Sequence, residues 1–133
     1  MHSPLVLPQL AAKRRWNLVF WSPVTCDQSC LNGLDNVARA RLALGRRLYR
    51  VDSWLLLGPN AGIIPASIRT SLHEIDTHVL KLATDDRRYH NKLPKIAMTY
   101  IVDPNGFLVL SYPGDVKPND IYHDLKQLLS SKE

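Results

Sequence analysis

The spacing of hydrophobic positions changes along the chain, and each change marks an expected element. Residues 16–21, WNLVFW, are apolar, aromatic or β-branched, which is typical of a buried strand. After Cys30 the apolar positions follow helical spacing, at Leu34, Val37, Ala38 and Leu42. The segment SPVTCDQS between them predicts a turn, and Gly45 is the expected C-cap of the helix. The candidates for the helix cap are Thr25, Asp27 and Ser29.

The next segments predict a second crossover. Residues 50–58 are expected to form a strand that completes a first βαβ unit. Residues 65–76 predict a short helix with Ile68, Leu72 and Ile75 on one face, and residues 78–84 alternate as a third strand.

The C-terminal third gives the clearest pattern. Residues 95–114 contain two β-rich runs around the turn signal DPNG, which predicts a hairpin. Residues 117–133 predict an amphipathic helix that begins at Pro118; its expected inward positions are Ile121, Leu125, Leu128 and Leu129. Together these elements predict an α/β, thioredoxin-like fold: a central mixed β-sheet flanked by helices, with a C-terminal hairpin and helix. We expect residues 1–15 to be a flexible tail and residues 16–133 to be the domain.

Composition narrows the function classes. The 133 residues carry a net charge of +5, and no apolar run approaches the roughly 20 residues that span a bilayer. Five arginines lie close together without an acidic residue between them, at positions 39, 41, 46, 47 and 50. They fit either a solvated helix face or a docking patch for an acidic protein, an anionic lipid or a nucleic acid. Because no RNA-binding, helix-turn-helix or zinc-finger motif is present, we expect no nucleic-acid partner.

Both cysteines of the chain, Cys26 and Cys30, lie in the expected turn between strand and helix. A thiol at a helix N-terminus is ionised more readily, and the thiolate both attacks disulfides and binds soft metals. A second cysteine four residues later can form a disulfide with the first or join it in binding a metal ion. A purely structural disulfide is the alternative, although so small a ring stabilises little by chain entropy.

The segments LVFWSPVTCDQSC and MTYIVDPNGFLVLSYPG resemble the Sco/SenC proteins, thioredoxin-like factors for the assembly of cytochrome c oxidase. The similarity extends from about Trp16 to the last helix. It implies that Cys26 and Cys30 match the copper-binding C-x-x-x-C pair of that family, and Tyr100 also fits its pattern. WNLVFWSP with ARLALGRRLYRV resembles a smaller branch, membrane-anchored proteobacterial proteins associated with the oxidase, for which no activity is defined.

The resemblance has one departure, at the third copper ligand. In the family this ligand is a histidine just before the first hairpin strand, where this chain has Lys95. His90 lies five residues earlier and is the candidate third ligand, whereas His73, His78 and His123 fall on expected helix or strand positions. Pro94 is a candidate for the cis-proline of thioredoxin-like redox proteins, with a trans turn proline as the default.

Three hypotheses follow. In the first, a Sco-like thiol–disulfide protein keeps the copper-site cysteines of an oxidase subunit reduced, with an exposed Cys26 as the attacking thiol and Cys30 as the resolving one. In the second, Cys26, Cys30 and His90 carry Cu(I). In the third, a non-catalytic domain has a fixed disulfide and docks through its arginines. The resemblance places the chain on the periplasmic side of the cytoplasmic membrane, tethered by a helix that this chain lacks.

Overall fold

The structure is a computed structural model, and it describes residues 14–59, 61–82 and 94–131. The elements, in chain order, are β1 (Trp16–Ser22), α2 (Gln28–Leu42), the 3₁₀ helix η1 (Gly45–Arg50), β2 (Val51–Leu57), α3 (Ala66–Glu74), β3 (Thr77–Lys81), β4 (Met98–Val102), β5 (Leu108–Pro113) and α4 (Pro118–Ser131). Every strand and helix expected from the sequence is present among them. The expected tail at 1–15 lies almost wholly outside the described residues.

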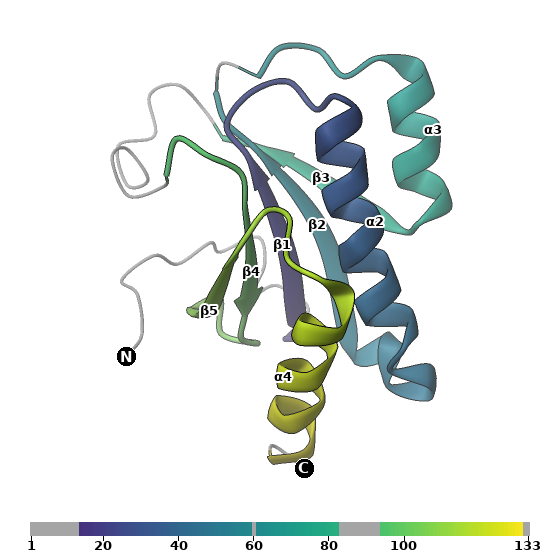
Figure 1. The fold of residues 1–133 in the computed structure, drawn as a ribbon, viewed down its shortest axis with the longest axis vertical. Helices are drawn as coiled ribbons and strands as arrows, with labels where there is room; N and C mark the ends of the chain where they lie inside the picture. Colours follow the sequence, from purple (N-terminus) through teal and green to yellow (C-terminus); the bar gives the residue numbers. More distant parts are fainter. Residues whose placement is uncertain (1–13, 60, 83–93, 132–133) are drawn as a thin grey trace.

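The five strands form one mixed sheet in the order β3-β2-β1-β4-β5. β1 pairs in parallel with β2, and β2 pairs in parallel with β3. β4 runs antiparallel to both β1 and β5, which confirms the C-terminal hairpin. This arrangement, with α4 closing the chain, is the predicted thioredoxin-like fold (Figure 1).

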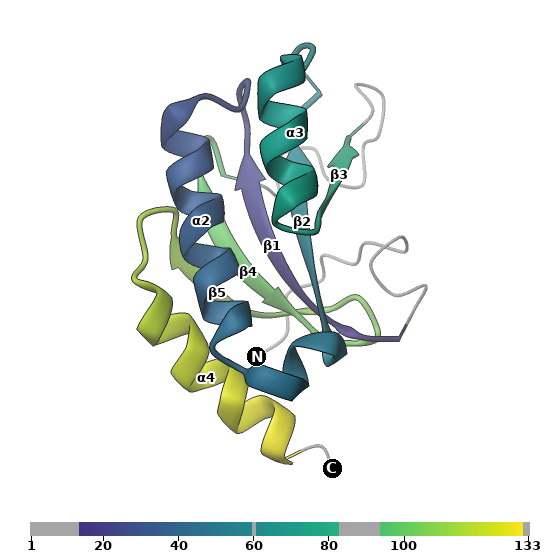
Figure 2. The ribbon, with the colours of Figure 1, turned by 90° about the vertical axis from the view of Figure 1, so that its right-hand side faces the viewer.

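The main core lies between the sheet and all three α-helices (Figure 2). Leu18 and Phe20 of β1 point into it, while the alternate residues Val19 and Trp21 belong to a second cluster on the other face. Helix α4 adds Ile121, Leu125 and Leu129, each 0% exposed, while Leu128 is only partly buried against the core. Since a fully buried leucine stabilises by about 1.5–3 kcal/mol, this stripe fixes α4 against the sheet.

The hairpin turn follows the expected chemistry. The Asp103 carboxylate accepts hydrogen bonds from the backbone N–H groups of Asn105 and Phe107, both at 2.9 Å. Gly106 takes a positive φ of 89°, a conformation that glycine adopts without strain. The expected C-cap of α2, Gly45, was wrong by two residues. The helix ends at Leu42 with Ala43 as its C-cap, and Gly45, with φ 63°, begins η1.

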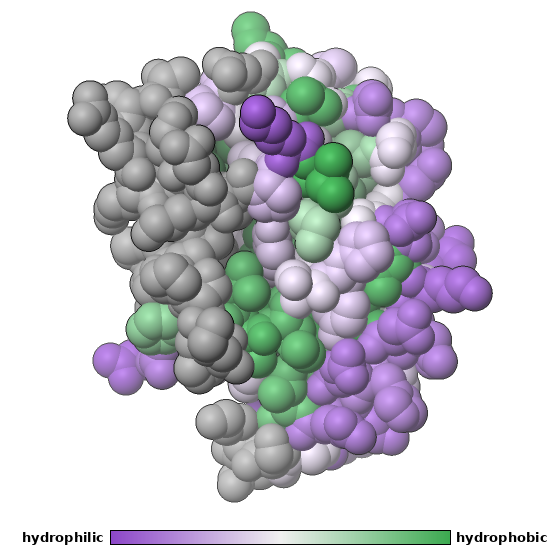
Figure 3. Space-filling model, turned by 60° about the vertical axis from the view of Figure 1, so that its left-hand side comes forward, coloured by the Kyte–Doolittle hydropathy of each residue, from purple (hydrophilic) through white to green (hydrophobic). Residues whose placement is uncertain are grey.

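Two opposite ends of the sheet matter for function. At the first, which we call the disulfide end, β1 and β2 finish and α2 begins (Figures 1 and 2). At the second, the arginine end, β1 begins and η1, the β4–β5 turn and the end of α4 come together. Hydrophobic surface gathers in the lower half of Figure 3, towards the arginine end.

Candidate functional site

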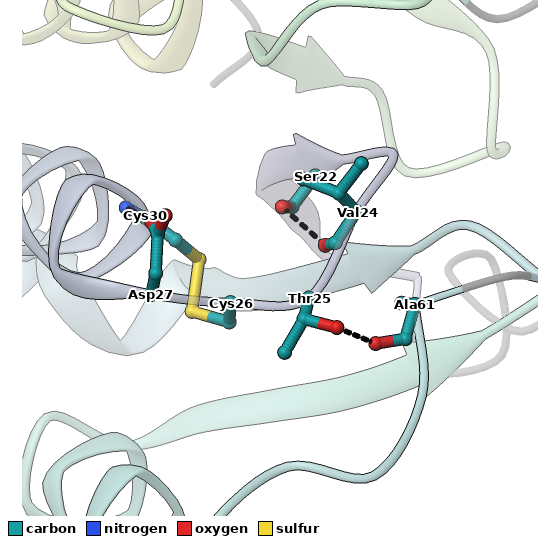
Figure 4. The surroundings of a disulfide bond; sticks show 7 residues. All are labelled: Ser22, Val24, Thr25, Cys26, Asp27, Cys30 and Ala61. Carbon is teal, nitrogen blue, oxygen red and sulfur yellow. Dashed lines mark hydrogen bonds between the residues drawn. A yellow bond between two sulfur atoms is a disulfide. The ribbon is translucent and has the colours of Figure 1, made fainter.

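Cys26 and Cys30 form a disulfide bond at the disulfide end of the sheet (Figure 4). Their Cα atoms lie 5.1 Å apart, within the range that a disulfide requires. The two sulfurs that the sequence predicted to share one site are therefore brought together. The described state is the oxidised one.

The junction between β1 and α2 is built by short-range hydrogen bonds. After β1 ends, the Ser22 hydroxyl donates to the backbone carbonyl of Val24 at 2.8 Å. Asp27 is the N-cap of α2, and its carboxylate accepts from the backbone N–H of Cys30 at 3.1 Å. Of the three cap candidates, Asp27 is thus the one used. The cap places Cys26 just before the helix and Cys30 in its first turn.

Both cysteines are buried, and the expected exposure of Cys26 was wrong. Cys26 is 1% and Cys30 5% exposed, and both belong to the main hydrophobic core. The cause is the loop between β2 and α3, which lies against the cysteine loop. The Thr25 hydroxyl donates a hydrogen bond to the carbonyl of Ala61 in that loop (Figure 4).

Gly58 tightens the same contact between the two loops. A side-chain carbon at residue 58 would lie 2.7 Å from the carbonyl oxygen of Pro23, so only glycine fits there without movement. The Gly58 N–H also donates to the carbonyl of Ser22 at 3.0 Å. The contact between the two loops thus covers the disulfide.

Two electrostatic effects at the site act in opposite directions on a cysteine thiolate. The N-terminus of α2 favours a thiolate on either cysteine in the reduced protein. The Asp27 carboxylate opposes this effect because it is negative and already accepts the N–H of Cys30. The N-cap thus holds the helix in place at some cost to thiolate stability.

The described residues do not supply a three-ligand copper site. No group of three histidine, cysteine or acidic side chains among them could hold a metal ion. His90 lies outside the described residues, so its role stays a prediction. His73 and His123 are exposed on α3 and α4, and His78 on β3 lies against Trp54 with ring centroids 4.9 Å apart. In the disulfide state neither sulfur is a thiolate, so the metal could be held only after reduction.

Pro94 lies beside the end of β1, whereas the thioredoxin-like pattern predicted a proline that faces the cysteines. The indole N–H of Trp21 donates to the Pro94 carbonyl at 2.8 Å. No peptide bond among the described residues is cis, but the bond preceding Pro94 includes residue 93, which is outside them. Its isomer therefore stays a prediction. The contact of Trp21 was not foreseen, because the strand pattern showed only that this residue would be buried.

Three exposed apolar side chains lie on segments at the disulfide end. Val24 follows β1, Ile63 follows β2 and Ile96 precedes β4, and they are 64%, 85% and 65% exposed. The sequence does not single out these three residues, because each lies in a loop, where the period of a strand or helix gives no information. They are apolar surface at the end of the molecule that carries the cysteines.

This strand–cysteine–helix junction on a mixed five-stranded sheet defines a thioredoxin-like protein. A family model, "Transmembrane-like, thioredoxin-like, C-terminal domain", matches residues 16–131, and the chain belongs to this family. No helix in the described ranges has the length and apolar character that crossing a membrane requires. No curated protein sequence matches the chain.

Solved structures give the same fold. Yeast Sco1 is 14% identical, with a TM-score of 0.69 over 92% of this chain and 83% of its own. ScoI of Bradyrhizobium japonicum, solved with copper bound, is 19% identical, with a TM-score of 0.58 over 85% and 84%. A thiol:disulfide interchange protein from Chlorobium tepidum is 13% identical, with a TM-score of 0.62 over 90% and 81%. The chain therefore has a Sco-like thioredoxin fold.

Proposed function

We propose that this chain is a Sco-like thiol–disulfide protein that acts in the assembly of the copper centre of cytochrome c oxidase. The observation that carries the proposal is the Cys26–Cys30 disulfide at the start of α2 in a Sco-like fold. The exposed apolar residues Val24, Ile63 and Ile96 offer contact surface for a protein partner at the same end. An oxidase subunit on the periplasmic side of the membrane is the proposed partner.

The proposed reaction transfers two electrons from the cysteine pair to a partner disulfide. The Cys26 thiolate attacks one sulfur of that disulfide, a mixed disulfide forms, and the other partner sulfur leaves as a thiolate. Cys30 then attacks the Cys26 sulfur, releases the second partner thiolate and closes the disulfide seen here. A dithiol donor must reduce Cys26 and Cys30 before the next cycle.

Burial of the pair makes access the controlling step. Separation of the cysteine loop from the β2–α3 loop breaks the hydrogen bond from Thr25 to Ala61. Because such a bond contributes about 1 kcal/mol, Thr25→Val should speed reduction by dithiothreitol about fivefold. Ser22→Ala is the matched control, since its hydroxyl bonds within its own loop and does not bridge the two. Equal rates in wild type and Thr25→Val would exclude this gate.

A fixed structural disulfide is the second candidate, favoured by the 1% and 5% exposure of the two cysteines. The reduction potential separates the two functions. Exchange proteins lie between about −270 and −120 mV, while structural disulfides lie below about −300 mV. In addition, Cys30→Ser should trap a mixed disulfide through Cys26, and Cys26→Ser should trap none. A potential below the exchange range, with no trapped species, would establish the structural alternative.

Copper remains a proposed cargo of the reduced pair. Two thiolates, from Cys26 and Cys30, suit Cu(I), and His90 is the proposed third ligand. Titration of the reduced protein with Cu(I) in the presence of a competing chelator should give one bound ion per chain. Loss of binding in either cysteine variant, with weaker binding in His90→Ala, would support this set of ligands. No retention of copper by the wild type would exclude the carrier role and leave the redox proposal standing.

A further inference from the structure

The arginine end carries a concentrated positive charge. Arg14 and Arg15 precede β1, and Arg46, Arg47 and Arg50 belong to η1. No acidic residue occurs between positions 36 and 51. The other two arginines of that stretch have partners on or beside their own helix: Arg39 pairs with Asp35 at 2.9 Å, and Arg41 donates to the Val51 carbonyl at 2.7 Å. Five arginines thus define this basic surface.

The acidic side chains near this end neutralise only part of the charge. Asp52 lies 3.3 Å from the Arg15 guanidinium and forms an ion pair with it. The Asp103 carboxylate accepts backbone N–H groups within the hairpin turn, so it serves the turn. Within the described ranges Arg14, Arg46 and Arg47 form no ion pair with an acidic side chain, so this surface keeps a positive potential.

A cavity of about 620 Å³ opens at the same end and has an amphiphilic lining. Arg14, Arg15 and Arg50 line its wall, together with Asp103, whose carboxylate accepts N–H groups of the hairpin turn. Trp16, Val109, Leu128 and Pro104 supply apolar surface. The hydrophobic area in the lower half of Figure 3 lies towards this end of the molecule. Guanidinium groups beside apolar walls match a ligand that combines an anionic head with a hydrocarbon part.

Two exposed side chains beside the arginines fit the same kind of ligand. Tyr49, in η1, is 74% exposed and also lines the cavity. Leu42, the last residue of α2, is 62% exposed. Tyrosine is enriched where protein meets the headgroup region of a bilayer, and arginines beside it add attraction to anionic lipids.

We propose that the arginine end docks on an anionic lipid surface. A lipid phosphate binds beside Arg14, the apolar part of the lipid lies along the apolar wall of the cavity, and Tyr49 enters the headgroup layer. The apolar lining distinguishes this partner from an acidic protein, for which the charge alone would suffice. The inference goes beyond the proposed function and does not depend on it.

The docked orientation follows from β1, which connects the two ends. Its seven residues, at roughly 3.3 Å each, separate the ends by about 20 Å. The disulfide end then faces away from the lipid and is open to a partner.

The test is cosedimentation of the full chain with vesicles. We expect binding to phosphatidylcholine vesicles that contain about one third phosphatidylglycerol, weakening as salt increases, and no binding to pure phosphatidylcholine. Each arginine removed should weaken binding about fivefold, so the triple variant Arg14→Gln, Arg46→Gln, Arg47→Gln should lose about 100-fold.

The control removes the same charge from other exposed positions. The triple variant Arg69→Gln, Lys95→Gln, Lys117→Gln alters α3 and the loops that precede β4 and α4. It should keep nearly full affinity, while Tyr49→Ser in the wild-type background should weaken binding at unchanged net charge. Thermal unfolding verifies that each variant is folded. No binding of the wild type to the anionic vesicles, or equal loss in both triple variants, would overturn the proposal.

Discussion

Gly33 offers a sharp test of the packing that positions Cys30. It lies in α2, one turn after Cys30, and faces β1. A methyl group at residue 33 would lie 2.6 Å from Cζ of Phe20 and 3.2 Å from the carbonyl oxygen of Gly114. Phe20 is only 2% exposed, so its ring could move aside only against the packed core around it. Otherwise the helix itself must shift away from the sheet.

Two effects of Gly33→Ala oppose each other. Alanine in place of glycine favours a helix by about 1 kcal/mol. Overpacking of a core costs about 1–3 kcal/mol, and a contact this short belongs near the upper limit. We therefore expect a net loss of about 1–2 kcal/mol in the free energy of unfolding.

The assay is urea unfolding of the oxidised protein. Asn32→Ala is the control, since Asn32 is exposed in the same helix and loses only a surface hydrogen bond to Gln28. Its stability should change by no more than about 0.5 kcal/mol. A Gly33→Ala protein as stable as the wild type, or more stable, would refute the argument that α2 is closely packed on β1.

Four further predictions concern the cap, the charge on the capping residue, the loop contact and alkaline pH. Asp27→Ala should lower the free energy of unfolding, measured in urea, by about 1 kcal/mol. Asp27→Asn can still cap the helix and should lower it by only a few tenths of a kcal/mol. Equal losses in the two variants would contradict the role of Asp27 as the cap. In the reduced protein, Asp27→Asn should also speed alkylation of Cys26 at fixed pH, because a negative charge near the thiolate is removed; an unchanged rate would count against that effect. Gly58→Ala should lower the free energy of unfolding by about 1–3 kcal/mol and speed reduction of the disulfide, because the added methyl group would clash with the Pro23 carbonyl. A variant that is as stable as the wild type and is reduced at the same rate would argue against the loop contact. Burial raises the pKa of Tyr100 from 10.0 to about 12. The free energy of unfolding should therefore fall as pH rises from 10 towards 12, by at most about 1.4 kcal/mol per pH unit for this group, and it should fall less steeply in Tyr100→Phe. Identical curves of unfolding free energy against pH for the two proteins would contradict this.

The local elements could be predicted because their signals are local. The DPNG turn depends on Asp103 and Gly106 alone, and both act as expected. The start of α2 depends on a capping side chain, and Asp27 was among the three candidates. The apolar stripe of α4 gave its buried face directly.

The surroundings of the cysteine pair could not be predicted because they depend on contacts between distant segments. Turn residues indicate a surface loop, yet Cys26 is buried because Thr25 bonds to Ala61, 36 positions later. Likewise Arg41 was grouped with a basic cluster, whereas its guanidinium bonds to the Val51 carbonyl. No periodicity in the sequence specifies which loop will lie against which.

The Asp27 cap has a consequence for the two oxidation states. It holds the backbone of Cys30 through an N–H group, whatever its sulfur is bonded to. The first turn of α2 should therefore keep its shape when the sulfurs separate, and amide exchange of that turn should be similar before and after reduction. A partner would then meet the same backbone shape in both states, and only the reactivity of the sulfurs would distinguish the dithiol from the disulfide.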